Sequence, residues 1–534
     1  MVERKTELTE THLYELYKQG VDYQYRIGIR KSIPECVRFY EGNQWPSPTE
    51  NTKNLPRPVV NVIKMICRSK KSAILSTPVK VSFKSYSSGV DVSRFNSFAD
   101  SIFKEMGQED IDRLAMDDGI KKGSYFYHYY WDSEAVDLNG IMDGGVGCEL
   151  INPLNIFFEN PSQINEQKQK WILISTQLDL NSVLSLVKDV KITRSQLEAD
   201  KNEDGSVTLF TRYFRIGGEV YCEKGTKSLI VAKPFPIAPE TEDDVPDGRV
   251  RANLYPVVCG FYERREGSIY GISEVEELIP NQKAINFNIA MSLLNAQECA
   301  WGKYVALPNA LKGQKISNVP GQVLIDHSGT GDGIKRLREQ SISDVPISIT
   351  SQIIDMTKST SGASGIISGD KEWSNMSGTA IAQLQAQSLL PIEELRNQFW
   401  EAKRKQGLIV AQFMKLYYYK RKFVTVKTQN GGEREIFDYF TSADYKNAIF
   451  DVCVEITGAS KSISASEISV LDSCLASGSI SIETFIKAYP DSAFPNKTEL
   501  LKQIELEKNS ELYKLREELK ALKKEGSKGV NYGK

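Results

Sequence analysis

Residues 272–298, with the sequence ISEVEELIPNQKAINFNIAMSLLNAQE, decide how the chain is organised. The spacing of their apolar side chains predicts a helix over 273–298, a rod about 40 Å long. Ser273 and Glu276 have the spacing of a capping box at its start. Amide side chains occur nearly all round this helix, with one cation, Lys283. This composition is typical of a helix packed between copies of itself beside a water-filled space. A long helix of an ordinary helical domain is the alternative.

A second helix is predicted to return beside the first. It begins near Ser343 or Asp344 and has Pro346 in its first turn, where the missing N–H costs no helical hydrogen bond. The insert between the two helices contains two strand-like segments, 304–307 and 322–325, separated by turn residues. A Gly/Ser-rich loop follows the second helix and precedes another very long helix. The prediction is therefore a helix pair that carries a small β-containing insert.

Elsewhere helices and strands are mixed, and the predicted fold class is α+β, mainly helical. Helices are expected at about residues 7–19, 23–40, 59–75, 93–106, 109–122, 377–420, 464–476 and 482–489, and after Pro495. Strands are expected at 79–83, 125–131, 171–178, 208–216, 219–223, 423–427 and 449–456. Pro391 is the expected kink of the long helix, and Gly217-Gly218 is the expected turn of a hairpin.

The composition indicates a globular protein of several domains. The chain has 534 residues, of which 40% are hydrophobic and 25% are charged, and its net charge is −2. This balance lacks the basic excess of proteins that bind nucleic acid tightly. None of the eight cysteines has C-x-x-C spacing, which argues against zinc and a disulfide framework and favours reduced thiols. No apolar run reaches the roughly 18 residues of a membrane span, so no membrane association is expected.

The sequence contains no recognisable catalytic motif. It has no G-x-x-x-x-G-K-[ST], H-E-x-x-H, G-x-S-x-G or Rossmann fingerprint, and only three histidines. His128 lies in an aromatic strand and is expected to be a packed residue rather than a ligand. Residues 200–205 match half of an EF-hand loop, but position twelve is Thr211 where calcium binding needs Glu, so a turn is predicted. We therefore expect no catalytic residue, no metal, no cofactor and no enzymatic activity.

Four stretches resemble, in the same order, parts of the portal (head-to-tail connector) proteins of tailed bacteriophages. They are RFYEGNQW (38–45) with the nearby segments at 57–61 and 75–78, YGISEVEELIPNQ (270–282), MSGTA (376–380), and the predicted helical hairpin at 464–489. None of these stretches is a catalytic signature, and the specificity of the match lies in their order along nearly the whole chain.

The resemblance implies the portal fold, with a wing, a stem, a clip and a crown, assembled into a ring that usually has twelve copies. It divides this chain into a wing (1–272), a first stem helix (273–301), a clip (302–340), a second stem helix (341–360), a tunnel loop (361–376), a long kinked helix with returning wing strands (377–461), crown helices (462–525) and a disordered tail (526–534).

The function that the resemblance implies is that of a pore at one capsid vertex, through which double-stranded viral DNA is packaged and later ejected. The expected partners are other copies of the chain, the DNA, the large subunit of the terminase motor, the major capsid protein and head-completion or adaptor proteins. The expected location is the virion, after assembly in the host bacterial cytoplasm. A nucleic-acid-processing enzyme of the packaging machinery is the alternative, and the missing phosphate-binding loop counts against it.

Three sets of residues are expected to carry this function. The stem set, expected at the subunit interface or the channel, is Asn286, Asn288, Asn295 and Lys283. The clip set, expected to dock the motor, is Lys312, Lys315, Asp326, Lys335 and Arg336. The tunnel-loop set, expected to contact DNA, is Gly365, Gly369, Lys371 and Trp373.

The charges of the predicted stem agree with a sliding function. Each fixed cation that neutralises a phosphate adds affinity for DNA, so a pore that lets DNA slide should have few of them. Lys283 is the single cation between residues 272 and 297, whereas three glutamates lie near the start of the helix. The clip lysines and arginines have a simpler interpretation as a solvated surface, and the Gly/Ser loop has one as a linker.

Overall fold

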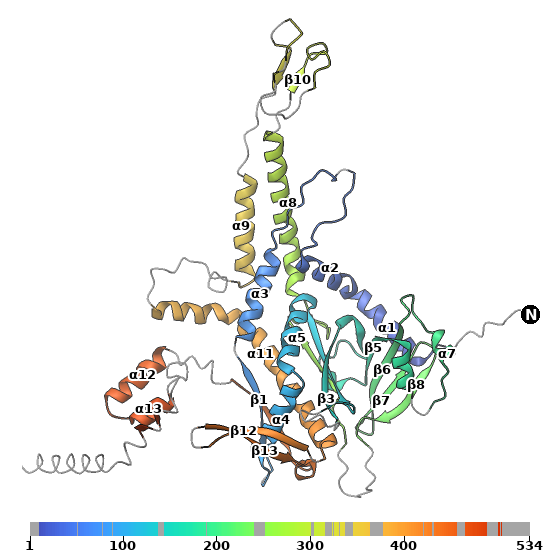
Figure 1. Cartoon of the computed structure of the whole chain (residues 1–534), viewed down its shortest axis with the longest axis vertical. Helices are drawn as coiled ribbons and strands as arrows, with labels where there is room; N and C mark the ends of the chain where they lie inside the picture. Colours follow the sequence, from blue (N-terminus) through green and yellow to red (C-terminus); the bar gives the residue numbers. More distant parts are fainter. Residues whose placement is uncertain are drawn as a thin grey trace, which may run out of the picture.

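The computed structural model describes the chain except for short gaps and the two termini. The described residues are 10–50, 52–76, 78–87, 89–136, 144–187, 190–239, 251–300, 304–315, 323, 325–329, 332–336, 345–363, 378–419, 421–429, 432–456, 465–488, 500–501 and 503–504. The fold is mixed α+β, with 46% helix and 22% strand, as predicted. Two helices, α8 (Glu274–Ala300) and α9 (Val345–Thr360), project from a larger body (Figure 1).

The N-terminal part of the body consists of five helices. They are α1 (His12–Arg26), α2 (Ile29–Glu41), α3 (Val62–Leu75), α4 (Val92–Glu105) and α5 (Gln108–Lys122). The predicted break between the first two helices, at residues 20–22, is wrong. The break lies at residues 27–28, where Gly28 has a φ of 83°, a left-handed conformation that favours glycine. Gly20 instead lies inside α1, where an added Cβ would be 2.4 Å from the Phe157 ring, so close packing requires this glycine.

Five antiparallel strands form the largest sheet, in the order β4-β5-β6-β7-β8. The strands are β4 (Ile156–Phe158), β5 (Trp171–Leu178), β6 (Val207–Ile216), β7 (Glu219–Gly225) and β8 (Ile230–Pro236), and the short helices α6 (Leu180–Ser185) and α7 (Arg194–Glu198) lie between β5 and β6 in the chain. The predicted β6–β7 hairpin is confirmed, because Gly217 and Gly218 connect the two strands with φ of 57° and 86°. The predicted turn after residue 200 is also present, closed by a hydrogen bond from Asn202 N to Ser206 O.

A three-stranded sheet, β3-β2-β9, lies at the centre of the body. It consists of β2 (Ser124–Asp132), β3 (Gly145–Ile151) and β9 (Val257–Phe261). Tyr125, Tyr127 and Tyr129 of β2 belong to the main apolar core, whereas Phe126 belongs to the core beneath the five-stranded sheet. The prediction of a strand buried on both faces is therefore confirmed. His128 is packed as expected: its Nδ1 lies 2.8 Å from a Glu149 carboxylate oxygen and its Nε2 lies 2.8 Å from the Tyr213 hydroxyl.

The C-terminal half returns to the same body through α11 (Gly378–Tyr417). Two-stranded sheets follow: β12 (Arg421–Gln429) pairs with β13 (Gly432–Phe440), and β14 (Phe450–Ile456) pairs with β1 (Val79–Ser85) near the N-terminus. The sequence did not predict β13. The helices α12 (Ala465–Ala476) and α13 (Ile482–Ala488) form the predicted helical hairpin around Gly478, whose φ is 70°. The predicted helix after Pro495 lies mostly outside the described residues.

One apolar core connects the projecting helices to the body. It joins α2, α3, α4, α5, β1, β2, the first half of α8 and the C-terminal half of α11. The seven cysteines whose side chains the structure describes are free thiols. Within the described ranges no helix has both the length and the hydrophobicity that crossing a bilayer requires. The same residues contain no His, Cys, Asp and Glu group arranged to hold a metal ion.

Candidate functional site: the helix pair and its attachment to the body

The helix pair, α8 with α9, begins at a serine that is fixed by the body. Ser273 Oγ donates to the backbone carbonyls of Ile120 and Lys121 at 2.8 and 3.0 Å, and accepts from Val275 N at 3.0 Å. The predicted capping box is therefore wrong in its second half. The carboxylate of Glu276 pairs with Arg265 at 3.3 Å instead of returning to the start of the helix. The helix start is thus attached to α5 rather than closed on itself.

Gln282 attaches α8 to the start of α3. Its side-chain oxygen accepts hydrogen bonds from Val62 N at 3.0 Å and Ile63 N at 3.3 Å, and its Nε2 donates to Val60 O at 2.7 Å. The first N–H groups of a helix have no partner within that helix and need an external acceptor. Gln282 is 1% exposed, so water cannot replace it in this role. One carboxamide therefore caps the start of α3 and holds α8 against it.

Asn286, one turn further along α8, extends this amide network to α2. Its Oδ1 accepts from Gln282 Nε2 at 3.0 Å, and its Nδ2 donates to Gln44 Oε1 at 2.6 Å. Gln44 in turn donates to Phe39 O, at the end of α2. Asn286 is 3% exposed in the single chain, so its side chain has no surface left for a channel or a neighbouring subunit. The predicted role of this residue is corrected: it serves the attachment of α8 to its own body.

The other predicted stem residues are placed differently. Lys283 Nζ lies 3.0 Å from a Glu35 carboxylate oxygen and 5.2 Å from the centre of the Phe39 ring, so the single cation of α8 is bound to α2. Asn288 and Asn295 are both half-buried. The structure therefore separates the predicted set into two residues held by the body and two that retain accessible surface.

A buried ion pair lies at the base of the helix pair, beside a polar cavity of about 550 Å³. Lys70 Nζ is 2.7 Å from a carboxylate oxygen of Glu274, which also accepts from the Tyr262 hydroxyl at 2.9 Å. Glu277 lines the same cavity, and burial together with the charges of Glu263 and Glu274 raises the pKa of its carboxyl. The sequence analysis missed this cluster, because Lys70 and Glu274 are 204 positions apart.

The insert at the far end of the helix pair is a short hairpin. Its strands β10 (Tyr304–Ala306) and β11 (Ile334–Arg336) pair antiparallel, which confirms the first predicted strand of the insert. The second predicted strand is not seen at the described positions 323 and 325, which have irregular structure. This hairpin joins two segments that are about 30 residues apart in the chain, and it keeps the ends of the insert together.

The predicted clip residues have different environments. Lys312 and Lys315 are exposed. Asp326 accepts backbone hydrogen bonds from Ser328 N and Gly333 N at 2.8 Å each, and hydrogen bonds from these two residues lower the pKa of its carboxyl, so it stabilises a turn of the insert. Lys335 pairs with Asp332 at 3.0 Å on the exposed side of β11. The backbone of Arg336 lies in β11, but its side chain is outside the described part of the structure.

The predicted tunnel-loop residues lie outside the described residues. These residues are Gly365, Gly369, Lys371 and Trp373. The described beginning of the loop contains Gly362, whose φ of 71° lets the chain turn sharply after α9, and Ala363, which is buried.

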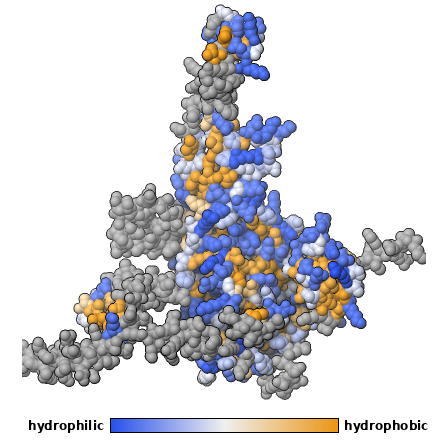
Figure 2. All heavy atoms as spheres, in the orientation of Figure 1, coloured by the Kyte–Doolittle hydropathy of each residue, from blue (hydrophilic) through white to orange (hydrophobic). Residues whose placement is uncertain are grey.

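Apolar side chains are exposed along both projecting helices. Figure 2 shows hydrophobic side chains gathered on the upper part of the molecule over these helices. Seven large apolar side chains on this surface are between 40% and 66% exposed. They are Phe287, Met291 and Leu293 on α8, and Val345, Ile347, Ile349 and Met356 on α9. We call this set the apolar stripe. A single chain leaves it in contact with water, which is unfavourable for side chains of this size.

The described geometry is that of a helix pair that projects from an α+β body and carries a small hairpin at its far end. The family model of the P22-like phage portal protein matches residues 243–510, which include α8, α9, α11, α12 and α13. The chain therefore belongs to the P22-like phage portal proteins, as the sequence resemblance predicted. No curated protein sequence matches it.

Family membership settles several expectations. Portal proteins are structural and non-enzymatic, so the alternative of a nucleic-acid-processing enzyme is set aside. A phage portal protein is located at the capsid vertex of the virion and acts in the context of DNA packaging.

The two kinds of stem asparagine should respond differently to substitution. Asn286→Leu should destabilise the folded monomer by about 1–3 kcal/mol, because it leaves Gln44 and Gln282 with buried unpaired polar atoms. Asn288→Leu should change the free energy of unfolding by less than about 0.5 kcal/mol, since this side chain is only half-buried. Urea unfolding of both variants under monomeric conditions measures the difference. Equal stability of the two variants would contradict the role assigned to Asn286.

Proposed function

We propose that copies of this chain form a closed ring, a dodecamer as is usual for portal proteins, whose pore carries double-stranded DNA during packaging and ejection. The observation that carries the proposal is the apolar stripe. In a ring with the helix pair around the central axis, the helices of neighbouring copies would cover these side chains. Burying one large apolar side chain is worth roughly 1.5–3 kcal/mol, so a few such contacts per subunit support a stable ring.

The proposal divides the chain by position along it. The helix pair is the stem, residues 302–340 are the clip, residues 361–376 are the tunnel loop, 462–525 is the crown, and the body is the wing. The helical hairpin of α12 and α13 and the continuity of α11 with the body support this division.

The expected partners follow from the same division. The clip, at the far end of the stem, is proposed to dock the terminase large subunit during packaging and head-completion or adaptor proteins afterwards. The wing is proposed to contact the major capsid protein. The exposed Lys312, Lys315 and Lys335 of the clip are proposed to take part in docking.

The charge of the stem supports a channel through which DNA slides. Lys283 is the single lysine or arginine of α8, and its ammonium group is neutralised by Glu35. Helix α9 likewise contains one, Lys358. Few fixed cations along the stem mean few tight phosphate contacts and therefore weak retention of the sliding duplex.

Ring formation can be tested through the apolar stripe. The double substitution Met291→Asp with Ile349→Asp should abolish the ring, because charged side chains would have to be buried between neighbouring stems. The monomer should still fold, since both side chains are at least 40% exposed in it. Native mass spectrometry measures the assembly. The matched control is Ile216→Asp, an equally exposed apolar residue at the far end of the β6–β7 hairpin. Rings formed as well by the double variant as by this control would refute the proposed interface.

Passage of DNA can be tested by adding charge to the stem. Asn288→Lys with Asn295→Lys, repeated in every copy of the ring, should slow or stall packaging, because the added cations bind phosphates along the channel. The slowing should be relieved at high salt, which screens these contacts and reduces counterion release. The rate of packaging at two salt concentrations provides the measurement, with Asn288→Gln and Asn295→Gln as the neutral control. A rate that is unchanged and insensitive to salt would count against a channel role for these positions.

The tunnel loop can be tested by deletion. We propose that the loop contacts DNA through Lys371 and Trp373, with Gly365 and Gly369 providing the necessary backbone freedom. Removing residues 366–373 should leave the ring intact in native mass spectrometry but reduce the DNA that filled particles retain. Normal retention would mean that the segment is only a linker, and loss of the ring would place it in the subunit interface.

A further inference from the structure

Helix α11 connects opposite sides of the molecule. Its 40 residues correspond to about 60 Å of helix. Figure 1 shows that it begins on the side of the body away from the five-stranded sheet and then descends into the body. Arg396 Nη2 of α11 donates a hydrogen bond of 3.0 Å to the carbonyl of Ala73 at the end of α3. A displacement of its first half would therefore reach the rest of the body through the contacts of its second half.

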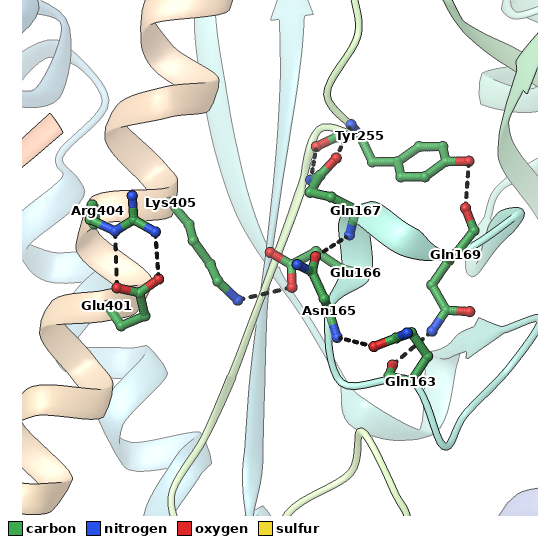
Figure 3. Close-up of polar contacts among 9 residues, drawn as sticks. All are labelled: Gln163, Asn165, Glu166, Gln167, Gln169, Tyr255, Glu401, Arg404 and Lys405. Carbon is green, nitrogen blue, oxygen red and sulfur yellow. Dashed lines mark hydrogen bonds and ion pairs between the residues drawn. The ribbon is translucent and has the colours of Figure 1, made fainter. Parts of the chain in front are cut away.

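The second half of α11 contacts the loop between β4 and β5 through a partly buried ion pair. Lys405 Nζ lies 2.9 Å from a carboxylate oxygen of Glu166 in the short helix η2 (Glu166–Lys168), as Figure 3 shows. Glu166 is 1% exposed. Burial raises the pKa of its carboxyl, and the Lys405 ammonium group opposes this shift. The buried carboxylate thus depends on α11 for its counter-charge, since no water can reach it.

The loop that carries Glu166 is held in place by several hydrogen bonds that do not involve α11. Gln167 bonds to both backbone groups of Tyr255: its Nε2 donates to the carbonyl at 3.1 Å, and its Oε1 accepts from the N–H at 2.8 Å. Arg215 on β6 donates to the same Oε1 at 2.9 Å. Gln169 Nε2 donates to the carbonyls of Asn160 and Gln163 at 2.8 Å each. A displacement of Glu166 would therefore move the five-stranded sheet, because the loop between them is held by these hydrogen bonds.

A second contact lies two helical turns further along α11. Gln412 Oε1 accepts from Asn253 N at 3.0 Å and Leu254 N at 2.9 Å, and its Nε2 donates to Leu254 O at 3.1 Å. Residues seven positions apart lie on nearly the same face of a helix. Lys405 thus binds the segment that contains Gln167, and Gln412 binds the segment that precedes Tyr255. These two segments are joined to each other by the hydrogen bonds between Gln167 and Tyr255. Arg215 also donates to Asn253 O, at 3.1 Å from its Nε, and so ties this second segment to β6.

We infer that Lys405 and Gln412 are positioning residues that couple α11 to the five-stranded sheet, so that the helix and the sheet move as one unit when the chain before α11 is displaced. The inference rests on the proposed ring function, in which residues 361–376 precede α11 and line the pore. A change of position there is carried by α11 to the opposite side of the subunit. Polar contacts suit this coupling because they hold one geometry, whereas apolar surfaces can slide against each other.

The test compares neighbouring lysine and arginine substitutions on the same helix. Lys405→Met removes the counter-charge of Glu166. Arg404→Met is the matched control, because Arg404 is half-buried like Lys405 but pairs with Glu401 on its own helix at 2.8 Å and does not contact the loop (Figure 3). Lys405→Arg keeps the charge and should restore normal behaviour. Three properties are measured on full-length protein: the mass of the ring, amide hydrogen exchange at 160–169 and 253–255, and the DNA content of particles assembled with each variant.

We expect Lys405→Met to form rings of normal mass. Its amide hydrogen exchange at 160–169 should be at least about tenfold faster, and its particles should contain severalfold less DNA. Arg404→Met and Lys405→Arg should behave like the unmodified protein. Exchange equal to that of Arg404→Met would overturn the inference. Two other results would also overturn it: normal DNA content in Lys405→Met particles despite faster exchange, and loss of the ring in Lys405→Met alone. Either result would mean that the contact contributes only to stability. If Lys405→Met does not fold, Gln412→Leu is judged in the same way, by exchange at 253–255. Failure of the unmodified chain to form a ring would instead refute the proposed function.

Discussion

The first two N–H groups of α3 have no acceptor in their own helix, and both donate to the carboxamide oxygen of Gln282 in α8. These residues are 220 positions apart in the chain, so this contact fixes the direction in which α8 leaves the body. Asn286 and Gln44 extend the same contact to the end of α2. Because all three amides are buried, loss of the Asn286 side chain leaves the Gln44 oxygen without its donor where water cannot compensate. The projecting helices are thus positioned by a few amides within a mainly apolar core.

This arrangement explains the unusual composition of α8. Its amides have two different purposes, which the sequence does not distinguish. Near the body they satisfy the backbone of other helices, whereas further out Asn288 and Asn295 retain accessible surface beside the apolar stripe. Asn281, next to Gln282 near the base of α8, donates to Thr357 Oγ1 at 3.1 Å and holds α9 against α8. A helix that must be anchored at one end and packed against other helices along its length needs both kinds of position.

Local patterns predicted most of the helices and the strands β1, β2, β5, β6, β7, β10, β12 and β14, but not β3, β4, β8, β9, β11 or β13. β5 was predicted with its observed bounds, because its apolar residues form a short run between turn residues, and the α12–α13 hairpin was predicted from Gly478. The errors arise where a distant contact overrides a local preference. Gly20 suggested a helix break but is required by the Phe157 ring, and the carboxylate of Glu276 pairs with Arg265 rather than with the helix start. The burial of Asn286 and the pair of Lys405 with Glu166 depend on partners more than 200 positions away, which no spacing rule reveals.

The apolar stripe has a further consequence for how the free subunit behaves. Burial of apolar surface is driven almost entirely by entropy near room temperature and weakens on cooling. An assembly held largely by such contacts gains affinity as the temperature rises towards that of growth and loosens in the cold. Before assembly, the same exposed side chains make each subunit prone to unspecific aggregation. Newly made chains would therefore benefit from rapid capture by one another, and the surface proposed to close the ring would also limit how many subunits can accumulate unassembled.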